Sequence, residues 1–356
     1  MIMGDHVTLT YGGKTVELPL VVGTEGEKAI DISSLRKHTG LITIDYGYAN
    51  TGSCYSAITY MDGENGILRY RGIPVEQLAE HSTFIETAYL LINGTLPTRT
   101  QLNRFSVLLN DNSLVHEDMR SFYEKYPRAS HPMGILSSMV NALRSFYPEL
   151  QSLEEEINIT MTRLLSKVRT MAAMSYKISR GHKMVYPRPD LTYCANFLNM
   201  MFDTPVKPYR LDGDLVEALN VFWILHADHE QNCSTSAVRV VGSGRVNLYA
   251  AISAGIAALW GPLHGGANQA VIEMLKEIRE AHTVHAAHVL PTRGAEAGVV
   301  DPHDSSTETR CEPGLLDSGA AAPDGRSLPK EPTCRQPKTR FNPGPPPALP
   351  RSWSQA

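Results

Sequence analysis

The segment LYAAISAGIAALWGPLHGGANQAVIEMLKEIREAH, residues 248–282, contains the pattern on which the fold prediction rests. Apolar residues recur at helical spacing on both sides of the Gly265–Gly266 pair, which predicts two helices joined by a turn that carries His264. Small residues dominate the first helix, so a neighbouring helix can approach it closely. The two glycines lack Cβ atoms and allow the same close approach of backbone or ligand beside the histidine.

Helical spacing also predicts the structure of most of the preceding chain. We expect residues 74–281 to form a largely α-helical body, with Pro74 near the start of a helix and Asn93-Gly94 at its end. Within residues 212–230, one apolar stripe is expected to face a neighbouring element, and Asp212 or Asp214 to cap the helix. That stripe comprises Leu215, Leu219, Phe222 and Leu225.

The two ends of the chain differ from this body. Residues 7–20 contain two short β-type runs around Gly12-Gly13, which predicts a hairpin. Residues 291–356 contain 12 prolines and 6 glycines, a composition typical of disordered chain. We therefore expect a β-containing segment over 1–50, a helical domain over 51–281 and a divergent, disordered tail over 282–356. The predicted fold class is mainly α.

Composition and charge limit the range of functions. The chain has 356 residues, of which 42% are hydrophobic and 20% charged, and its formal net charge is −4. This balance gives no reason to expect a nucleic acid or a membrane as partner. No basic segment followed by an apolar run opens the chain, so we expect a cytoplasmic protein. Five scattered cysteines without a Cys-X-X-Cys pair agree with a reducing compartment: Cys54, Cys194, Cys233, Cys311 and Cys334.

His264 is the first candidate for chemistry. If the second helix begins near Gly266, its unpaired N–H groups lie beside the imidazole and disfavour the charged form. A neutral ring can donate a hydrogen bond to a developing oxyanion. From spacing alone, a helix-capping or buried structural histidine is the more common case.

The segment HADHEQN, residues 226–232, is the second candidate. His226 and His229 are expected on one face near a helix end, with Asp228 pointing elsewhere. Three interpretations compete: a metal site with Glu230, a nucleophile made by Cys233 and a histidine, and a polar cleft that binds an anionic or carbonyl substrate. The cleft fits best, because no third metal ligand of suitable spacing follows and nothing else activates the thiol.

Several longer segments together resemble one enzyme family. They are GILRYRGIPVEQLAE (66–80), SHPM (130–133), RLLSKVRTMAAMSYK (163–177), VYPRPDLTYCANFLNMMF (185–202), ILHADHEQNCSTS (224–236) and LWGPLHGGANQAV (259–271). Over about residues 5–281 the chain resembles bacterial citrate synthase of the hexameric Gram-negative type. The resemblance implies a multi-helical large domain, followed here by a truncated small domain.

The resemblance also implies a reaction and its residues. Acetyl-CoA, as co-substrate, loses a methyl proton, and the enolate attacks oxaloacetate; no cofactor and no metal are involved. His264 corresponds to the histidine that hydrogen-bonds the enolate, in a segment completed by Gly265 and Gly266. His229 corresponds to a histidine that binds oxaloacetate and His226 to its neighbour. Ser234 stands where the family has a serine near the catalytic histidine.

The family pattern is not continued after residue 281. The segment bearing the second catalytic histidine, the segment bearing the catalytic aspartate, and the arginines that bind oxaloacetate have no counterparts there. Four histidines lie in this part of the chain, none in a family motif: His282, His285, His288 and His303. We therefore expect impaired turnover. The alternative is an inactive homologue that acts only as an assembly or interaction subunit.

The resemblance further implies self-association and a regulatory site. A homo-oligomer, a dimer or a hexamer of dimers, is expected. Tyr147, Arg163 and Lys167 correspond to an allosteric NADH site, although the default interpretation of the spacing between the two cations is a solvated basic face. Asp111 replaces an expected arginine and would repel a pyrophosphate, and Val206 replaces a cysteine.

Overall fold

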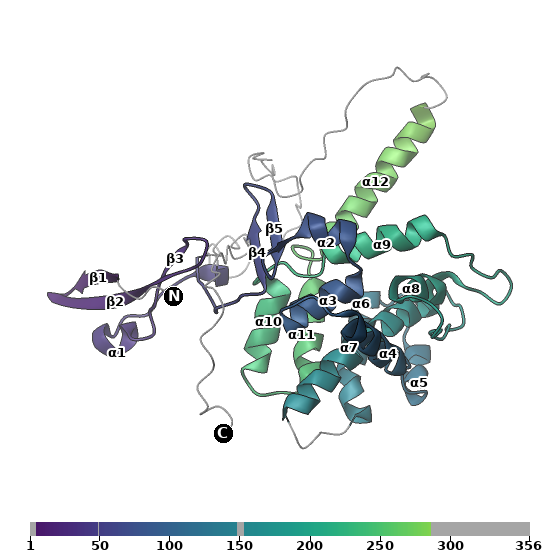
Figure 1. Cartoon of the computed structure of the whole chain (residues 1–356), viewed down its shortest axis with the longest axis horizontal. Helices are drawn as coiled ribbons and strands as arrows, with labels where there is room; N and C mark the ends of the chain where they lie inside the picture. Colours follow the sequence, from purple (N-terminus) through teal and green to yellow (C-terminus); the bar gives the residue numbers. More distant parts are fainter. Residues whose placement is uncertain (1–4, 49, 148–152, 286–356) are drawn as a thin grey trace, which may run out of the picture.

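In the computed structural model, residues 5–48, 50–147 and 153–285 are described. Two small antiparallel sheets precede and flank a helical body (Figure 1). The mainly helical fold class is confirmed. No helix in the described part of the chain is both long and apolar enough to cross a bilayer.

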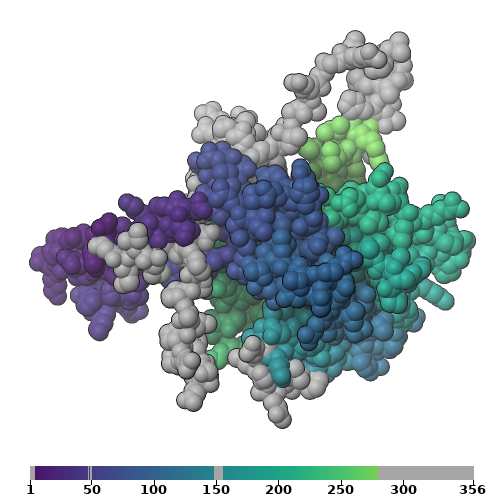
Figure 2. Space-filling model, viewed as in Figure 1, coloured from purple at the N-terminus to yellow at the C-terminus, as the bar shows by residue number. Residues whose placement is uncertain are grey.

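The first sheet confirms the predicted N-terminal hairpin. Strands β1 (His6–Tyr11) and β2 (Lys14–Val22) pair antiparallel through Gly12 and Gly13, whose φ angles of 58° and 73° suit glycine. A third strand, β3 (Lys28–Ile30), was not predicted; it pairs with β2 and is followed by α1 (Leu35–Thr39) and a short 3-10 helix, η1 (Tyr46–Tyr48). This segment extends from the helical body, as Figure 2 also shows.

The second sheet was not predicted. Its strands β4 (Thr59–Asp62), β5 (Ile67–Tyr70) and β6 (Ile73–Pro74) form an antiparallel meander that leads directly into α2 (Val75–His81). Four residues or fewer per strand give too few alternations to identify from spacing. The sheet nevertheless carries residues that contact the candidate site.

The single helix expected from Pro74 to Gly94 is two helices. α2 ends before Ser82, and α3 (Phe84–Asn93) begins with a capping box in which Thr83 and Glu86 bond each other's backbone N–H groups. This cap satisfies helix-terminal donors that a continuous helix would not expose. The predicted stop is confirmed, because Gly94 adopts φ 86° at the end of α3.

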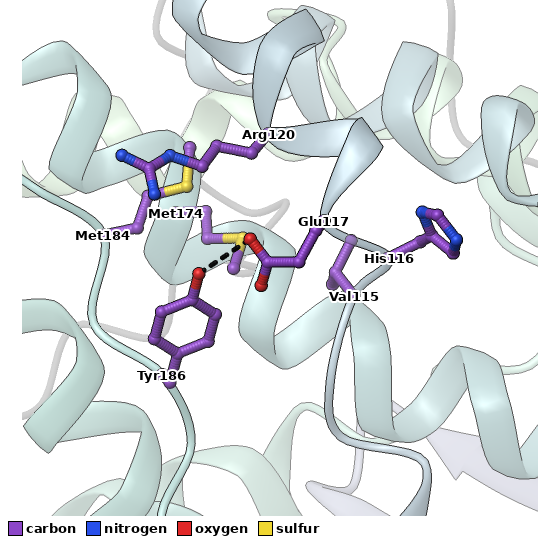
Figure 3. A pocket seen from close by; sticks show the side chains of 7 residues that line it. All are labelled: Val115, His116, Glu117, Arg120, Met174, Met184 and Tyr186. Carbon is purple, nitrogen blue, oxygen red and sulfur yellow. Dashed lines mark hydrogen bonds between the residues drawn. The ribbon is translucent and has the colours of Figure 1, made fainter.

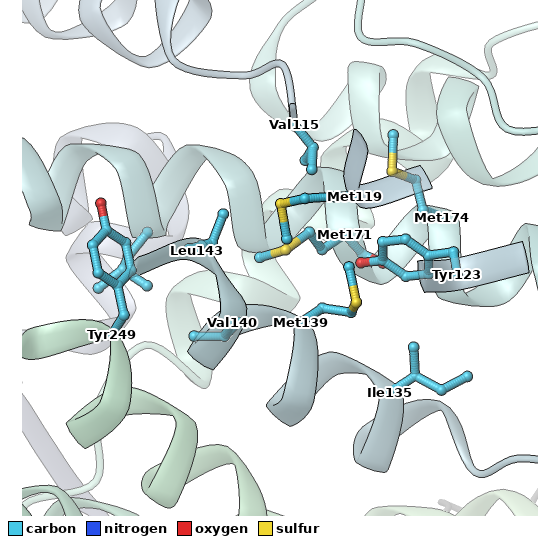
Figure 4. Packing of buried hydrophobic residues seen from close by; sticks show 11 residues of the cluster. Val115, Met119, Tyr123, Ile135, Met139, Val140, Leu143, Met171, Met174 and Tyr249 are labelled. Atoms are coloured by element: carbon cyan, nitrogen blue, oxygen red, sulfur yellow. The ribbon is translucent and has the colours of Figure 1, made fainter. Parts of the chain in front are cut away.

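The remaining helices form the body around the long helix α7. In chain order they are α4 (Arg99–Asp111), α5 (Asp118–Lys125), α6 (Pro132–Ala142), η2 (Leu143–Phe146), α7 (Leu153–Ser179), α8 (Tyr193–Phe202), α9 (Gly213–Leu225), α10 (Cys233–Gly242), α11 (Leu248–Leu259) and α12 (Gly266–His285). Helix α7 packs against α4, α5, α6, α8 and α11. Its buried Met171 and Met174 join Met119, Met139 and Tyr249 in the largest core cluster (Figure 4).

The stripe expected on α9 does not face the core. Leu215 and Phe222 are 53% and 51% exposed, and the helix instead buries Ile224 and Asn220. Asn220 faces inward because its amide oxygen accepts the N–H of Phe84 at the start of α3. Asp212 caps α9, as predicted. Helix α12 continues to His285, past the boundary expected at residue 281, and the rest of the expected tail, from residue 286 onward, lies outside the described residues.

Candidate active site

The turn between α11 and α12 places His264. The N–H of Gly265 donates to the carbonyl of Leu259 at 3.0 Å, and the N–H of Gly266 donates to that of Gly261 at 3.1 Å. A Cβ atom added at Gly265 would collide with the Leu259 carbonyl oxygen. Glycine is therefore required here for the turn to close on itself, and this closure fixes the position of the histidine.

His264 contacts a serine from a different helix. Oγ of Ser234, in the first turn of α10, lies 2.8 Å from Nε2 of His264 and 3.0 Å from the Gly255 carbonyl. The single hydroxyl proton can serve only one of these two acceptors. When it is donated to Nε2, a neutral His264 ring carries its proton on Nδ1, which is then a hydrogen-bond donor for a ligand.

Burial favours the neutral form of this ring. Desolvation lowers the pKa of His264 below its usual value. Burial thus shifts the pKa in the direction of the neutral ring that the sequence predicts. Helix α12 does begin at Gly266, and the N–H of Ala267 donates to the His264 carbonyl at 3.1 Å.

Close packing of α10 and α11 sets the distance between serine and histidine. A Cβ atom on Gly255 would lie 2.7 Å from Cγ2 of Val238 and 3.4 Å from the Ser234 carbonyl oxygen. No side chain fits between the helices at this point. The predicted close approach of a second helix to the small residues of α11 is therefore confirmed.

The two histidines of the HADHEQN segment follow the end of α9. That helix ends at Leu225, so the expectation that both rings share a helical face is wrong; a turn brings them together instead. Their ring centroids lie 6.2 Å apart with nearly parallel planes. Nδ1 of His226 lies 2.8 Å from the Phe222 carbonyl oxygen, and Nε2 of His229 lies 3.2 Å from that of Leu225.

The other interpretations of this segment gain no support. Within the described residues there is no cluster of three or more histidine, cysteine or acidic side chains that could hold a metal ion. The Glu230 carboxylate accepts the backbone N–H of Met61 at 2.8 Å. Cys233 is exposed at the start of α10.

Sequence reasoning missed the contribution of the second sheet. Thr59 from β4 lines a small pocket of about 50 Å³ together with Asp228, Glu230 and Gln231. Burial raises the pKa of Asp228. The Tyr70 hydroxyl lies 3.0 Å from the Ile224 carbonyl oxygen. The four-residue strand that ends in Tyr70 is too short to give a spacing signal in the sequence.

A second pocket lies between α5 and α7 (Figure 3). The Tyr186 hydroxyl donates to the Glu117 carboxylate across it at 3.0 Å. Its volume of about 10 Å³ is enough for about one water molecule. It is therefore too small for a substrate.

The structure brings together the three residues expected at a regulatory site. The guanidinium of Arg163 and the ammonium of Lys167 lie 4.4 Å and 5.1 Å from the centroid of the Tyr147 ring. Lys167 is buried and donates to the carbonyls of Asn112 and Leu114, and burial lowers its pKa to about 8. The interpretation as a solvated basic face is therefore wrong for Lys167.

Comparison with known proteins identifies the family of this arrangement. The family model for the C-terminal domain of citrate synthase matches residues 47–296. The chain belongs to the citrate synthase family. Citrate synthase 1 of Mycobacterium tuberculosis is 49% identical over 297 residues, which cover 83% of this chain and 69% of that protein.

Solved citrate synthases have a similar fold. The enzyme of Thermotoga maritima is 35% identical with a TM-score of 0.57, over 66% of this chain and 61% of that one. The Thermoplasma acidophilum citrate synthase, solved as a ternary complex with carboxymethyl coenzyme A and oxaloacetate, is 27% identical with a TM-score of 0.62, over 67% of this chain and 61% of that one. The chain thus covers about three fifths of these two solved citrate synthases.

Proposed function

We propose that this chain binds acetyl-CoA and oxaloacetate as a citrate synthase, at the entry to the tricarboxylic acid cycle. The observation that carries the proposal is the 2.8 Å contact between Ser234 and His264 on a turn that only glycine can close. It holds a neutral imidazole at a fixed position, which the stabilisation of an enolate requires. The finer assignment to the hexameric Gram-negative type is part of this proposal.

Each candidate residue has a role in the proposed reaction. The free nitrogen of His264 donates to the enolate oxygen of acetyl-CoA, and Gly265 and Gly266 close the turn that fixes the position of this ring. His229 and His226 bind oxaloacetate from the turn after α9. Acetyl-CoA is a co-substrate, and the proposed reaction requires no cofactor or metal.

We further propose that turnover by this chain is impaired. The support for this proposal is that no segment after residue 281 resembles the family segments that carry the catalytic aspartate, the second catalytic histidine or the oxaloacetate-binding arginines. A positioned general base alone contributes about 10²- to 10⁴-fold. Binding is therefore expected to be better preserved than catalysis.

Calorimetry and a thiol-release assay test these two statements separately. We expect the full chain to bind oxaloacetate, His229→Asn to bind it at least about tenfold more weakly, and the control His81→Gln to bind it normally; His81 is exposed on α2. If the full chain binds neither oxaloacetate nor acetyl-CoA, the substrate assignment is rejected. Turnover of about 10 s⁻¹, typical of enzymes, would reject the impairment.

A role in assembly is the second candidate, favoured by the surface of α12. This helix projects from the body (Figure 1), and its apolar residues are 39–52% exposed in the described structure: Val271, Ile272, Met274, Leu275 and Ile278. We propose that they are covered in a homo-oligomer. Light scattering should give a dimer or larger species for the full chain and a smaller one for Leu275→Glu.

Regulation by NADH stays a prediction. Arg163 is the available cation of the cluster, since its buried Nε has no hydrogen-bond partner in the described structure, whereas Lys167 already donates to two carbonyls. A fluorescence titration should show saturable NADH binding that Arg163→Ala abolishes. A linear, unsaturable response would reject the site.

A further inference from the structure

The turn that carries His226 and His229 is fastened to a buried tyrosine from the second sheet. Tyr70, the last residue of β5, is fully buried. Its Oη atom lies 3.0 Å from the carbonyl oxygen of Ile224 and 3.4 Å from that of Leu225, and it accepts the N–H of Asp228 at 3.4 Å. One hydroxyl group thereby bridges the chain just before and just after His226.

We propose that Tyr70 is the positioning residue of the two-histidine turn. The assignment of oxaloacetate as the ligand of this turn rests on the proposed function. The role of Tyr70 in positioning the two histidines does not depend on it. The Leu225 carbonyl oxygen connects tyrosine and histidine directly, because Nε2 of His229 lies 3.2 Å from the same atom. Displacement of the last turn of α9 therefore displaces the His229 ring.

The turn needs an external anchor after His226, because the last α-helical hydrogen bond of α9 runs from the N–H of His226 to the Phe222 carbonyl oxygen at 3.2 Å. Glu230 adopts φ 54°, which is uncommon for a residue with a side chain. The β4–β5 hairpin supports this side of the turn as well, since the N–H of Met61 donates to the Glu230 carboxylate at 2.8 Å. Burial raises the pKa of Tyr70 to about 12, so its hydroxyl keeps its proton throughout the neutral range.

Tyr70→Phe tests the proposal, with Tyr123→Phe as a matched control. Both tyrosines are fully buried, and the Tyr123 hydroxyl also contacts a backbone carbonyl, that of Met171 at 3.4 Å. Each variant loses one buried hydroxyl from a core, but only Tyr70 contacts the histidine turn. The full chain is labelled with ¹⁵N-histidine, and ring signals are assigned with His226→Asn, His229→Asn and His264→Gln.

We expect Tyr70→Phe to shift the ring signals of His226 and His229, leave that of His264 in place, and weaken oxaloacetate binding about 5- to 10-fold, the effect of about one hydrogen bond. Tyr123→Phe should lower the melting temperature without moving these signals. Unchanged His226 and His229 signals in Tyr70→Phe, or equal shifts in both variants, would overturn the proposal.

Two further outcomes are also informative. If the ring signals move but the full chain binds no oxaloacetate, the positioning role stands and the proposed substrate falls. If Tyr70→Phe does not fold, Glu230→Ala replaces it, since it removes the Met61 contact from the same hairpin. A shifted His229 signal in that variant supports the anchoring of the turn by the hairpin, and an unshifted one overturns it.

Discussion

Oγ of Ser234 and Nε2 of His264 lie 2.8 Å apart although the two residues are 30 positions apart in the chain. Ser234 lies at the start of α10 and His264 follows the end of α11, so the contact depends on the packing of these two helices. The same hydroxyl lies within 3.0 Å of the Gly255 carbonyl oxygen. The orientation of the imidazole thus depends on the Ser234 hydroxyl, which can donate its hydrogen bond either to His264 or to the Gly255 carbonyl oxygen.

If the chain binds acetyl-CoA as proposed, Ser234→Ala should weaken that binding by about 5- to 10-fold, because the His264 ring loses about one hydrogen bond. Calorimetry measures the affinity. Ser253→Ala is the control, since Ser253 on α11 also forms a hydrogen bond between helices, to Ser137, without contacting His264. Equal losses in both variants would argue against a specific role for Ser234.

Gly265→Ala should destabilise the fold by about 1–3 kcal/mol, because the added Cβ collides with the backbone at Leu259. Gly213→Ala, at the start of α9, should change stability by less than about 0.5 kcal/mol, since no atom lies within 4 Å of the added Cβ. Urea unfolding measures both. A Gly265→Ala variant as stable as the parent would contradict the described turn.

The pH dependence of stability should report the burial of His264. Its pKa in the folded chain lies below the 6.5 of the free side chain. The unfolded chain therefore binds more protons as the pH falls through 6.5, and stability declines there. His264→Gln should show a smaller decline between pH 7.5 and 5.5 in urea titrations. A decline equal to that of the parent chain would show that this ring is not the group responsible.

Lys167 should change the stability of the fold at a higher pH than His264 does. Its pKa is about 8 in the folded chain against 10.5 when free, so stability should rise as the pH increases between these values. Lys167→Met lacks this titration, and the parent chain should gain stability relative to it from pH 8 to pH 10. Denaturant midpoints at both values measure the gain. A constant difference between the two proteins would contradict the burial of the ammonium.

Short sequence patterns correctly predicted the turns and helix ends that depend on neighbouring residues. The glycine turn of the N-terminal hairpin, the Asp212 cap of α9 and the stop at Gly94 depend on a few neighbouring residues with strong backbone preferences. The proximity of Ser234 to His264 was expected only from the family resemblance. No spacing rule relates residues on different helices.

The failures have a common physical origin in tertiary contacts. Asn220 rather than the apolar stripe of α9 faces inward because it satisfies the N–H of Phe84. The role of Tyr70 depends on a strand of four residues packing against the end of a helix 154 positions later. Neither contact leaves a periodic signal in the sequence.

Gly255 makes the geometry of the site sensitive to a position that takes no part in the chemistry. Val238 of α10 packs directly against the backbone of Gly255 in α11. One methyl group on Gly255 would therefore push the two helices apart and move Ser234 away from the imidazole. A substitution at Gly255, which no ligand is expected to contact, would therefore break the Ser234–His264 contact without replacing either of these residues.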